Sequence, residues 1–127
     1  HYYDAKGVQN VYLGKYTRVN GDVVSGPSAS DLVAANSAKT DGMVQLKLAE
    51  TMAAMQKMTD MAEAGMAYDQ MLAEGNANGN AIIQGTVDAL VAQTKTFETA
   101  MNELGLSRPE FEGSDSLDDP ASVATAN

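Results

Sequence analysis

A histidine and an aspartate at the start of the chain have the residue types and the spacing of a partial metal site. His1 and Asp4 are three residues apart, and residues three apart on a helix share a face. An imidazole nitrogen and a carboxylate oxygen are both ligands that transition metals accept. The pair therefore predicts two ligands of a metal ion that other groups would complete. The alternative is a polar pair at a helix end that binds nothing.

The methionines offer a second kind of metal ligand. The chain holds eight of them, and thioether sulfur binds soft metals such as Cu(I). However, Met52, Met55 and Met58 follow one another at steps of three, which is the spacing of a buried helix stripe. Because methionine is flexible and fills irregular gaps in a core, we expect these side chains to pack in the interior.

The end of the chain is the most acidic part of an acidic sequence. The formal net charge is −9, so a nucleic-acid phosphate backbone would be repelled and we expect no nucleic-acid partner. Five carboxylates lie close together near the C-terminal end, at Glu110, Glu112, Asp115, Asp118 and Asp119. Such oxygens can hold a hard cation, but their spacing is not that of a calcium loop. We expect a solvated tail.

Several common kinds of site are excluded by composition. The chain has no cysteine and one histidine, so it has neither a thiolate nucleophile nor a site made of cysteines or several histidines. No nucleophile paired with a general base stands out, so we do not expect the chain to be an enzyme by itself. No apolar run approaches the ~20 residues that a membrane-spanning helix needs.

Two long helices are the elements that must position these residues. Apolar side chains at steps of three and four predict one helix over 38–64, capped by Ser37, and a second over 80–104. A short helical turn is expected over 68–73. The inward stripe of the first helix should be Val44, Leu48, Met52, Met55, Met58 and Ala62. That of the second should be Ile83, Val87, Leu90, Val91, Thr94, Phe97, Met101 and Leu104.

Shorter elements precede the long helices. A helix is expected over 2–14, with Gly14 as its stop. A β-hairpin is expected over 16–24, because Asn20-Gly21 readily supplies the two positive φ angles of a tight turn. Ser28 should cap a short helix that runs to Asn36.

These elements predict an all-α fold. It is half of a helical bundle, with two long antiparallel helices, shorter N-terminal helices and a small β-hairpin. We divide the chain into a helical subdomain, 1–106, and an acidic irregular tail, 107–127. Because two striped helices cannot bury both apolar faces against each other, we expect a partner segment. Four of the five tyrosines lie in the first sixteen residues and are expected to line that junction.

Segments spread along most of the chain resemble the imelysin family of exported bacterial proteins. In order they are HYYD at 1–4, GVQNVYLGKY at 7–16, RVNG at 18–21, GPS at 26–28, DLVA at 31–34, YDQM at 68–71, ALVAQT at 89–94 and GSDSLD at 113–118. Each is weak alone, and their order is what makes the resemblance fairly specific. The segments correspond to the C-terminal third of family members.

The resemblance implies a fold and a setting. Imelysin-like proteins are all-helical, with two related bundle-like halves. They are exported to the periplasm or held at the outer membrane as lipoproteins, many are regulated by iron, and relatives serve in iron uptake. The resemblance therefore implies that the N-terminal half of the same protein is the partner. Iron or another divalent metal would be bound mainly by that half, with this half as scaffold and part of the cleft.

The resemblance also raises a catalytic alternative. The family has been classed as metallopeptidases on a proposed GxHxxE metal motif, which lies upstream of the segments matched here. This chain departs from the motif, because Asp4 rather than Glu stands three residues after His1, so no catalytic role is carried over. We favour a metal-binding protein. The alternatives are the C-terminal half of a metallopeptidase and a helical scaffold with no small ligand.

Overall fold

The computed structural model of the chain describes residues 1–107. All but the first residue of the predicted acidic tail, with its five clustered carboxylates, thus lies outside the described residues. The elements run in the order α1 (Tyr2–Leu13), β1 (Lys15–Thr17), β2 (Val23–Ser25), α2 (Ala29–Asn36), α3 (Ala38–Glu63), α4 (Tyr68–Met71) and α5 (Ala77–Glu103). The predicted all-α fold, with two long helices and a small hairpin, is confirmed.

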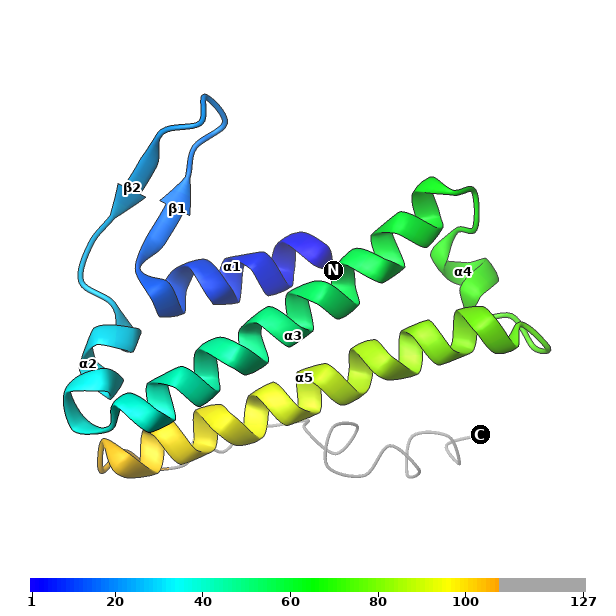
Figure 1. The fold of residues 1–127 in the computed structure, drawn as a ribbon. Helices are drawn as coiled ribbons and strands as arrows, with labels where there is room; N and C mark the ends of the chain where they lie inside the picture. Colours follow the sequence, from blue (N-terminus) through cyan, green and yellow to red (C-terminus); the bar gives the residue numbers. More distant parts are fainter. Residues whose placement is uncertain (108–127) are drawn as a thin grey trace.

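The helices are arranged around α3. It runs antiparallel to α5 and shares its most extensive interface with that helix, while α1 lies on the other side of α3 (Figure 1). The short helix α2 packs against α1 and α3 at one end of the molecule, and α4 packs on α5 at the other. Because α1 is much shorter than α3, it covers only part of that side of α3.

Side-chain caps set where the helices begin. The hydroxyl oxygens of Ser28 and Ser37 accept backbone hydrogen bonds at the N-terminal ends of α2 and α3, as predicted. The start of α5 lies before the predicted Asn80, because the side chain of Asn76 accepts a hydrogen bond from the backbone N–H of Gly79. An asparagine side chain satisfies the free backbone N–H groups of a helix N-terminus as well as serine does, so residues 77–79 belong to the helix.

The hairpin is present, but its turn differs from the predicted one. Tyr16 faces Val24 in the antiparallel register, and the carbonyl of Arg18 accepts a hydrogen bond from the N–H of Gly21. Gly21 has a φ of 91°, whereas Asn20 stays at negative φ. The expected two-residue turn with two positive φ angles is therefore wrong. A three-residue loop with one left-handed glycine replaces it.

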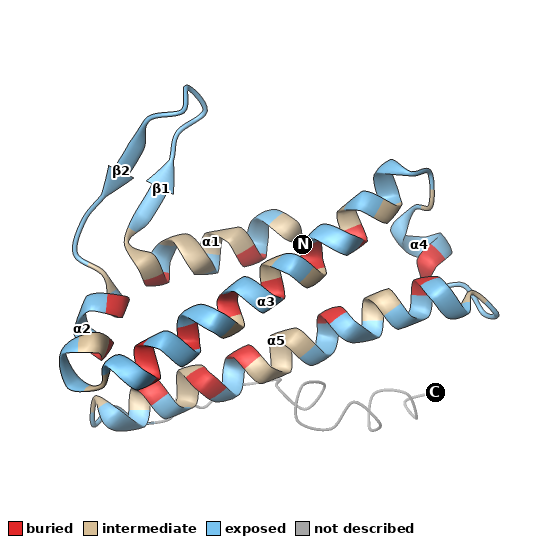
Figure 2. Ribbon diagram, in the orientation of Figure 1, coloured by how far each residue is buried: buried red, intermediate tan, exposed pale blue. Residues whose placement is uncertain are grey.

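The inward face of α3 agrees well with its predicted stripe. Val44, Leu48, Met55 and Met58 are buried, whereas Ala62 is exposed (Figure 2). The buried face also takes in three polar residues that hydropathy did not indicate: Thr40, Asp41 and Thr51. Polar groups thus lie among the apolar ones along the centre of the molecule.

The predicted orientation of α5 is wrong in part. Val87 and Thr94, expected to face inward, are exposed, and the buried residues are Gly79, Thr86, Gln93, Thr96 and Ala100. Small side chains let α5 approach α3 closely, and threonine hydroxyls bond to nearby backbone carbonyls. The hydroxyl of Thr86 donates to the carbonyl of Ile82 at 3.0 Å. The spacing of hydrophobic residues therefore does not reveal a packing face that is made of small and polar side chains.

Replacing Gln93 by methionine is expected to stabilise the fold by about 1 kcal/mol, because a buried polar atom without a partner costs about that much. The Oε1 atom of Gln93 is buried and has no hydrogen-bond partner within residues 1–107. Urea denaturation of the variant would measure the gain. The control is Gln84→Met on the exposed side of the same helix. An unchanged or lower free energy of unfolding for Gln93→Met would contradict the prediction.

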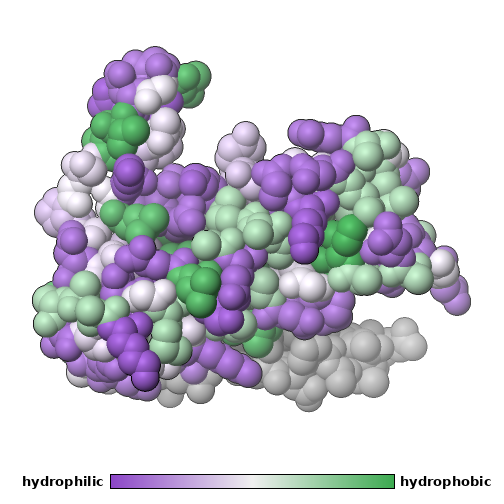
Figure 3. Space-filling model, in the orientation of Figure 1, coloured by the Kyte–Doolittle hydropathy of each residue, from purple (hydrophilic) through white to green (hydrophobic). Residues whose placement is uncertain are grey.

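Large apolar side chains also remain on the surface. Several lie on α1 and on the hairpin, where both strands are exposed, and Figure 3 shows the apolar spots on this face separated by hydrophilic surface. The most exposed are Tyr3, Val11, Tyr16, Val19 and Val23. Within residues 1–107, no helix has both the length and the hydropathy of a membrane span.

Candidate functional site

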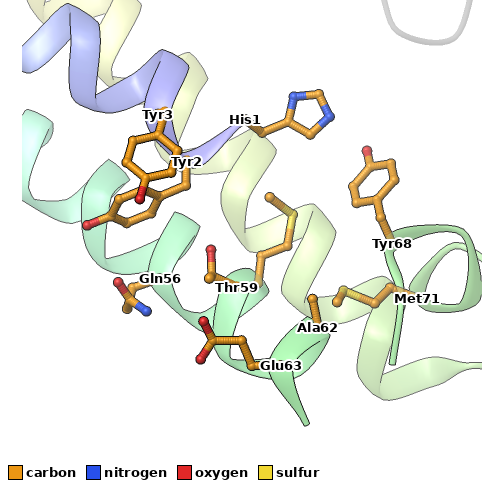
Figure 4. Close-up of a pocket in the computed structure, with 10 residues that line it drawn as sticks. His1, Tyr2, Tyr3, Gln56, Thr59, Ala62, Glu63, Tyr68 and Met71 are labelled. Atoms are coloured by element: carbon orange, nitrogen blue, oxygen red, sulfur yellow. The ribbon is translucent and has the colours of Figure 1, made fainter. Parts of the chain in front are cut away.

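An open groove of about 480 Å³ lies where the start of α1 meets the C-terminal part of α3 and the short helix α4 (Figure 4). Its floor is apolar and its edges carry aromatic and polar side chains. The lining residues are His1, Tyr2, Tyr3, Gln56, Met58, Thr59, Ala62, Glu63, Tyr68 and Met71. Three elements that are distant in the sequence therefore combine to form one surface.

The position of α4, which carries Tyr68, is set by a glycine in α5. A Cβ atom on Gly79 would lie 2.6 Å from the Cα of Met71, so α4 rests directly on the backbone of α5. The side-chain amide of Asn80 donates a hydrogen bond to the carbonyl of Met71 at 2.8 Å. Because Met71 is fully buried, α4 is held firmly and Tyr68 is presented at the edge of the groove.

The predicted metal pair lies at the rim of this groove. The ring of His1 is 5.4 Å from the ring of Tyr68, between centroids. The Oδ2 atom of Asp4 lies 3.3 Å from the α-amino nitrogen of His1, and Asp4 is not among the residues that line the groove. Within residues 1–107, no three or more histidine, aspartate and glutamate side chains gather where they could hold a metal. The metal pair therefore stays a prediction.

Glu63 is a groove residue that sequence reasoning missed. It comes three residues after Asp60, so the two carboxylates lie on one face of α3. In the structure, Asp60 accepts a hydrogen bond from Gln56 at 2.7 Å, whereas Glu63 lines the groove. It makes no hydrogen bond or ion pair with residues 1–107. No local pattern in the sequence marks it, because the groove exists only once α1 and α4 are placed against α3.

The methionines pack as expected. Met55, Met58 and Met71 are buried together with Ala5 in one apolar cluster. The partly buried methionines that pack against this cluster are Met52, Met61 and Met66. The prediction is confirmed for Met55 and Met58 and for the partly buried Met52, whereas Met43, which belongs to the same series, is exposed. Met58 also lines the groove.

A buried polar cluster at the other end of α3 is a second feature that the sequence did not reveal. The Oδ1 atom of Asp41 accepts hydrogen bonds from the hydroxyls of Tyr12, at 2.8 Å, and Ser30, at 2.7 Å. The Oδ2 atom accepts from the side-chain amide of Gln45 at 2.7 Å. These bonds tie α1 and α2 to the first turns of α3, where the helix dipole also favours a carboxylate.

The stability of the fold is expected to fall at alkaline pH because of Tyr12. Burial raises the pKa of Tyr12 well above its ordinary value of 10.0, and the hydrogen bond and charge of Asp41 raise it further. In the unfolded chain the phenol ionises near pH 10, so the stability that comes from the raised pKa of Tyr12 is fully present below pH 10. Above that pH it is lost at about 1.4 kcal/mol per pH unit. Urea denaturation between pH 9 and about pH 11 would measure the slope.

Tyr12→Phe should reduce that slope, because phenylalanine has no proton to lose. Tyr3→Phe is the matched control, since Tyr3 is exposed and its hydroxyl is solvated in both states. The same slope in the Tyr12→Phe variant as in the parent would contradict the prediction.

Comparison with known protein families finds that the peptidase family described as imelysin matches residues 1–97. No curated protein matches the chain. The matched range includes every residue of the groove and of the Asp41 cluster.

Proposed function

Because the chain belongs to the imelysin family, we propose that it forms one wall of a metal-binding cleft in a periplasmic protein that handles iron. The metal follows from a family that is metallopeptidase-like. The observation that carries the proposal is the position of His1. Its imidazole lies at the rim of the groove and makes no hydrogen bond with residues 1–107, and Asp4 lies one helical turn further along the chain.

The remaining ligands would come from a companion segment, the N-terminal half of the same protein. The exposed apolar side chains of α1 and the hairpin support such a partner, because water-exposed Tyr3, Val11 and Val19 gain stability when they are covered. In this arrangement α3 and α5 are the scaffold. An upstream lipoprotein signal would tether the whole protein to the outer membrane, and the acidic charge argues against a nucleic-acid partner.

Metal titration tests the proposal. The 127-residue chain, preceded by a short neutral extension so that His1 has no free α-amino group to chelate the metal, would be titrated with Zn²⁺ and, without oxygen, Fe²⁺, followed by NMR. Weak binding with shifts centred on His1 is expected, because two ligands are an incomplete set. His1→Ala and Asp4→Asn should each reduce it, while Asp69→Asn, an equal charge change at α4, should not. A protein that also carries the companion half should bind more tightly. Unchanged binding in both His1→Ala and Asp4→Asn would refute the role of this pair.

The family's designation as a peptidase favours a second candidate, chelator-sensitive peptidase activity of the complete protein. In that case the residues of this chain would position the substrate, and the catalytic metal would be held upstream. A peptide-cleavage assay of the complete protein, with and without chelator, separates the two functions. Peptide cleavage that the chelator abolishes would support the peptidase, and the absence of any cleavage would favour a protein that only binds metal.

A further inference from the structure

We propose, building on the metal-binding function above, that Tyr68 is a further ligand from this chain. Its phenolate oxygen binds a ferric ion beside the imidazole of His1. Tyr68 begins α4, whereas His1 directly precedes α1, so no spacing along the chain indicates the pair. Only the folded molecule brings the two side chains together.

The side chains of His1 and Tyr68 face each other at one end of the groove. Their ring centroids are 5.4 Å apart, and Figure 4 shows the hydroxyl end of Tyr68 directed toward the imidazole. Neither the imidazole nor this hydroxyl makes a hydrogen bond with residues 1–107. Two atoms that bind one metal ion lie roughly 3 Å apart, because each is about 2 Å from the ion. Rings at this separation need only side-chain rotation to bring both donor atoms to one ion.

The fold fixes the position of Tyr68 and leaves its hydroxyl accessible. Its helix α4 rests on Gly79 of α5 and is anchored by the buried Met71. The backbone N–H of Ala67 donates a hydrogen bond to the side chain of Gln70 at 2.8 Å, which closes the start of α4. The side chain of Tyr68 itself is exposed, so an ion reaches it from solvent. A ligand whose backbone is already fixed loses less freedom on binding.

The two donor types together suit Fe³⁺. Imidazole nitrogen is a ligand that iron accepts, and a tyrosine oxygen holds iron in some haem proteins. A phenolate is an anionic oxygen donor, and its attraction to an ion rises with the charge of that ion, so it favours Fe³⁺ over Fe²⁺. The phenol gives its proton to the buffer as it binds, and the iron stays ferric. No lysine or arginine lines the groove to repel a cation, and its one carboxylate is Glu63.

Visible absorption spectroscopy tests the proposal, because a phenolate bound to Fe³⁺ gives a charge-transfer band that free tyrosine lacks. The 127-residue chain with the neutral extension would be mixed with Fe³⁺ as its nitrilotriacetate complex, and the spectrum of that complex alone would be subtracted. A new band is expected, and it should disappear when urea unfolds the chain and separates α1 from α4. If no band forms while Zn²⁺ still shifts the NMR signals of His1, the role of Tyr68 is overturned and the proposed metal-binding function stands.

Variants then identify the ligand. Tyr68→Phe removes only the hydroxyl and should abolish the band. Tyr3→Phe is the matched control, because Tyr3 also lines the groove but its ring packs against Tyr2, and the band should stay. His1→Ala should weaken the band. Circular dichroism confirms that each variant is folded. A band that survives in Tyr68→Phe, or that keeps its full intensity in His1→Ala, would refute a ferric site shared by these two residues.

Discussion

Replacing Asp41 by alanine is expected to lower the free energy of unfolding by about 3 kcal/mol, because buried hydroxyls would lose their acceptor. Tyr12 and Ser30 both donate to this carboxylate, and all three side chains are buried. A donor left without a partner in the interior pays its full cost of desolvation. Urea denaturation followed by circular dichroism would measure the loss.

Two further variants separate the network from simple loss of volume. Asp41→Asn keeps one acceptor oxygen and should cost less than Asp41→Ala. Tyr12→Phe removes one donor and should cost about 1 kcal/mol in the parent. In the Asp41→Ala background the loss of that hydroxyl should cost much less, because its acceptor is already gone. Strict additivity of the two substitutions would contradict a shared hydrogen-bond network.

Leu48→Ala is expected to lower the free energy of unfolding by about 3 kcal/mol, since a buried leucine loses its transfer free energy and leaves a cavity. Leu48 is 1% exposed and lies among Tyr12, Val33, Val44 and Ala100. Chemical denaturation again provides the measurement.

Leu46→Ala is the matched control for this prediction. Leu46 lies on the same helix but is 56% exposed, so its substitution should change stability by about 0.5 kcal/mol or less. Comparable losses in the two variants would show that α3 is not oriented as described.

The helices could be predicted because their signals are local. Apolar residues at steps of three and four located α3 and α5, and the serines at positions 28 and 37 located two helix starts. Met52, Met55 and Met58 were correctly placed in or against the core for the same reason. The glycine after α1 also acted as expected, since Gly14 takes a left-handed conformation that ends the helix.

The features that were missed depend on contacts between distant segments. Tyr12 and Asp41 are 29 residues apart, and nothing near either one indicates that they meet. Glu63 and Tyr68 become groove residues only when α1 is laid across α3. The orientation of α5 followed small residues and threonine, such as Thr86, rather than the most apolar stripe. A hydropathy scale measures the transfer of a side chain from water to an apolar medium, and it does not include the hydrogen bond that a buried hydroxyl makes with a backbone carbonyl.

The central place of α3 has a consequence for how the molecule opens. Since α1, α2 and α5 all pack on it, opening of α1 and the hairpin leaves the pair of long helices together, whereas unwinding α3 releases every neighbour at once. Amide protons should therefore exchange with solvent soonest in the hairpin, next in α1, and last in the middle of α3. We therefore expect α1 and the hairpin to open as a local unit, whereas α3 unfolds only when the whole fold does.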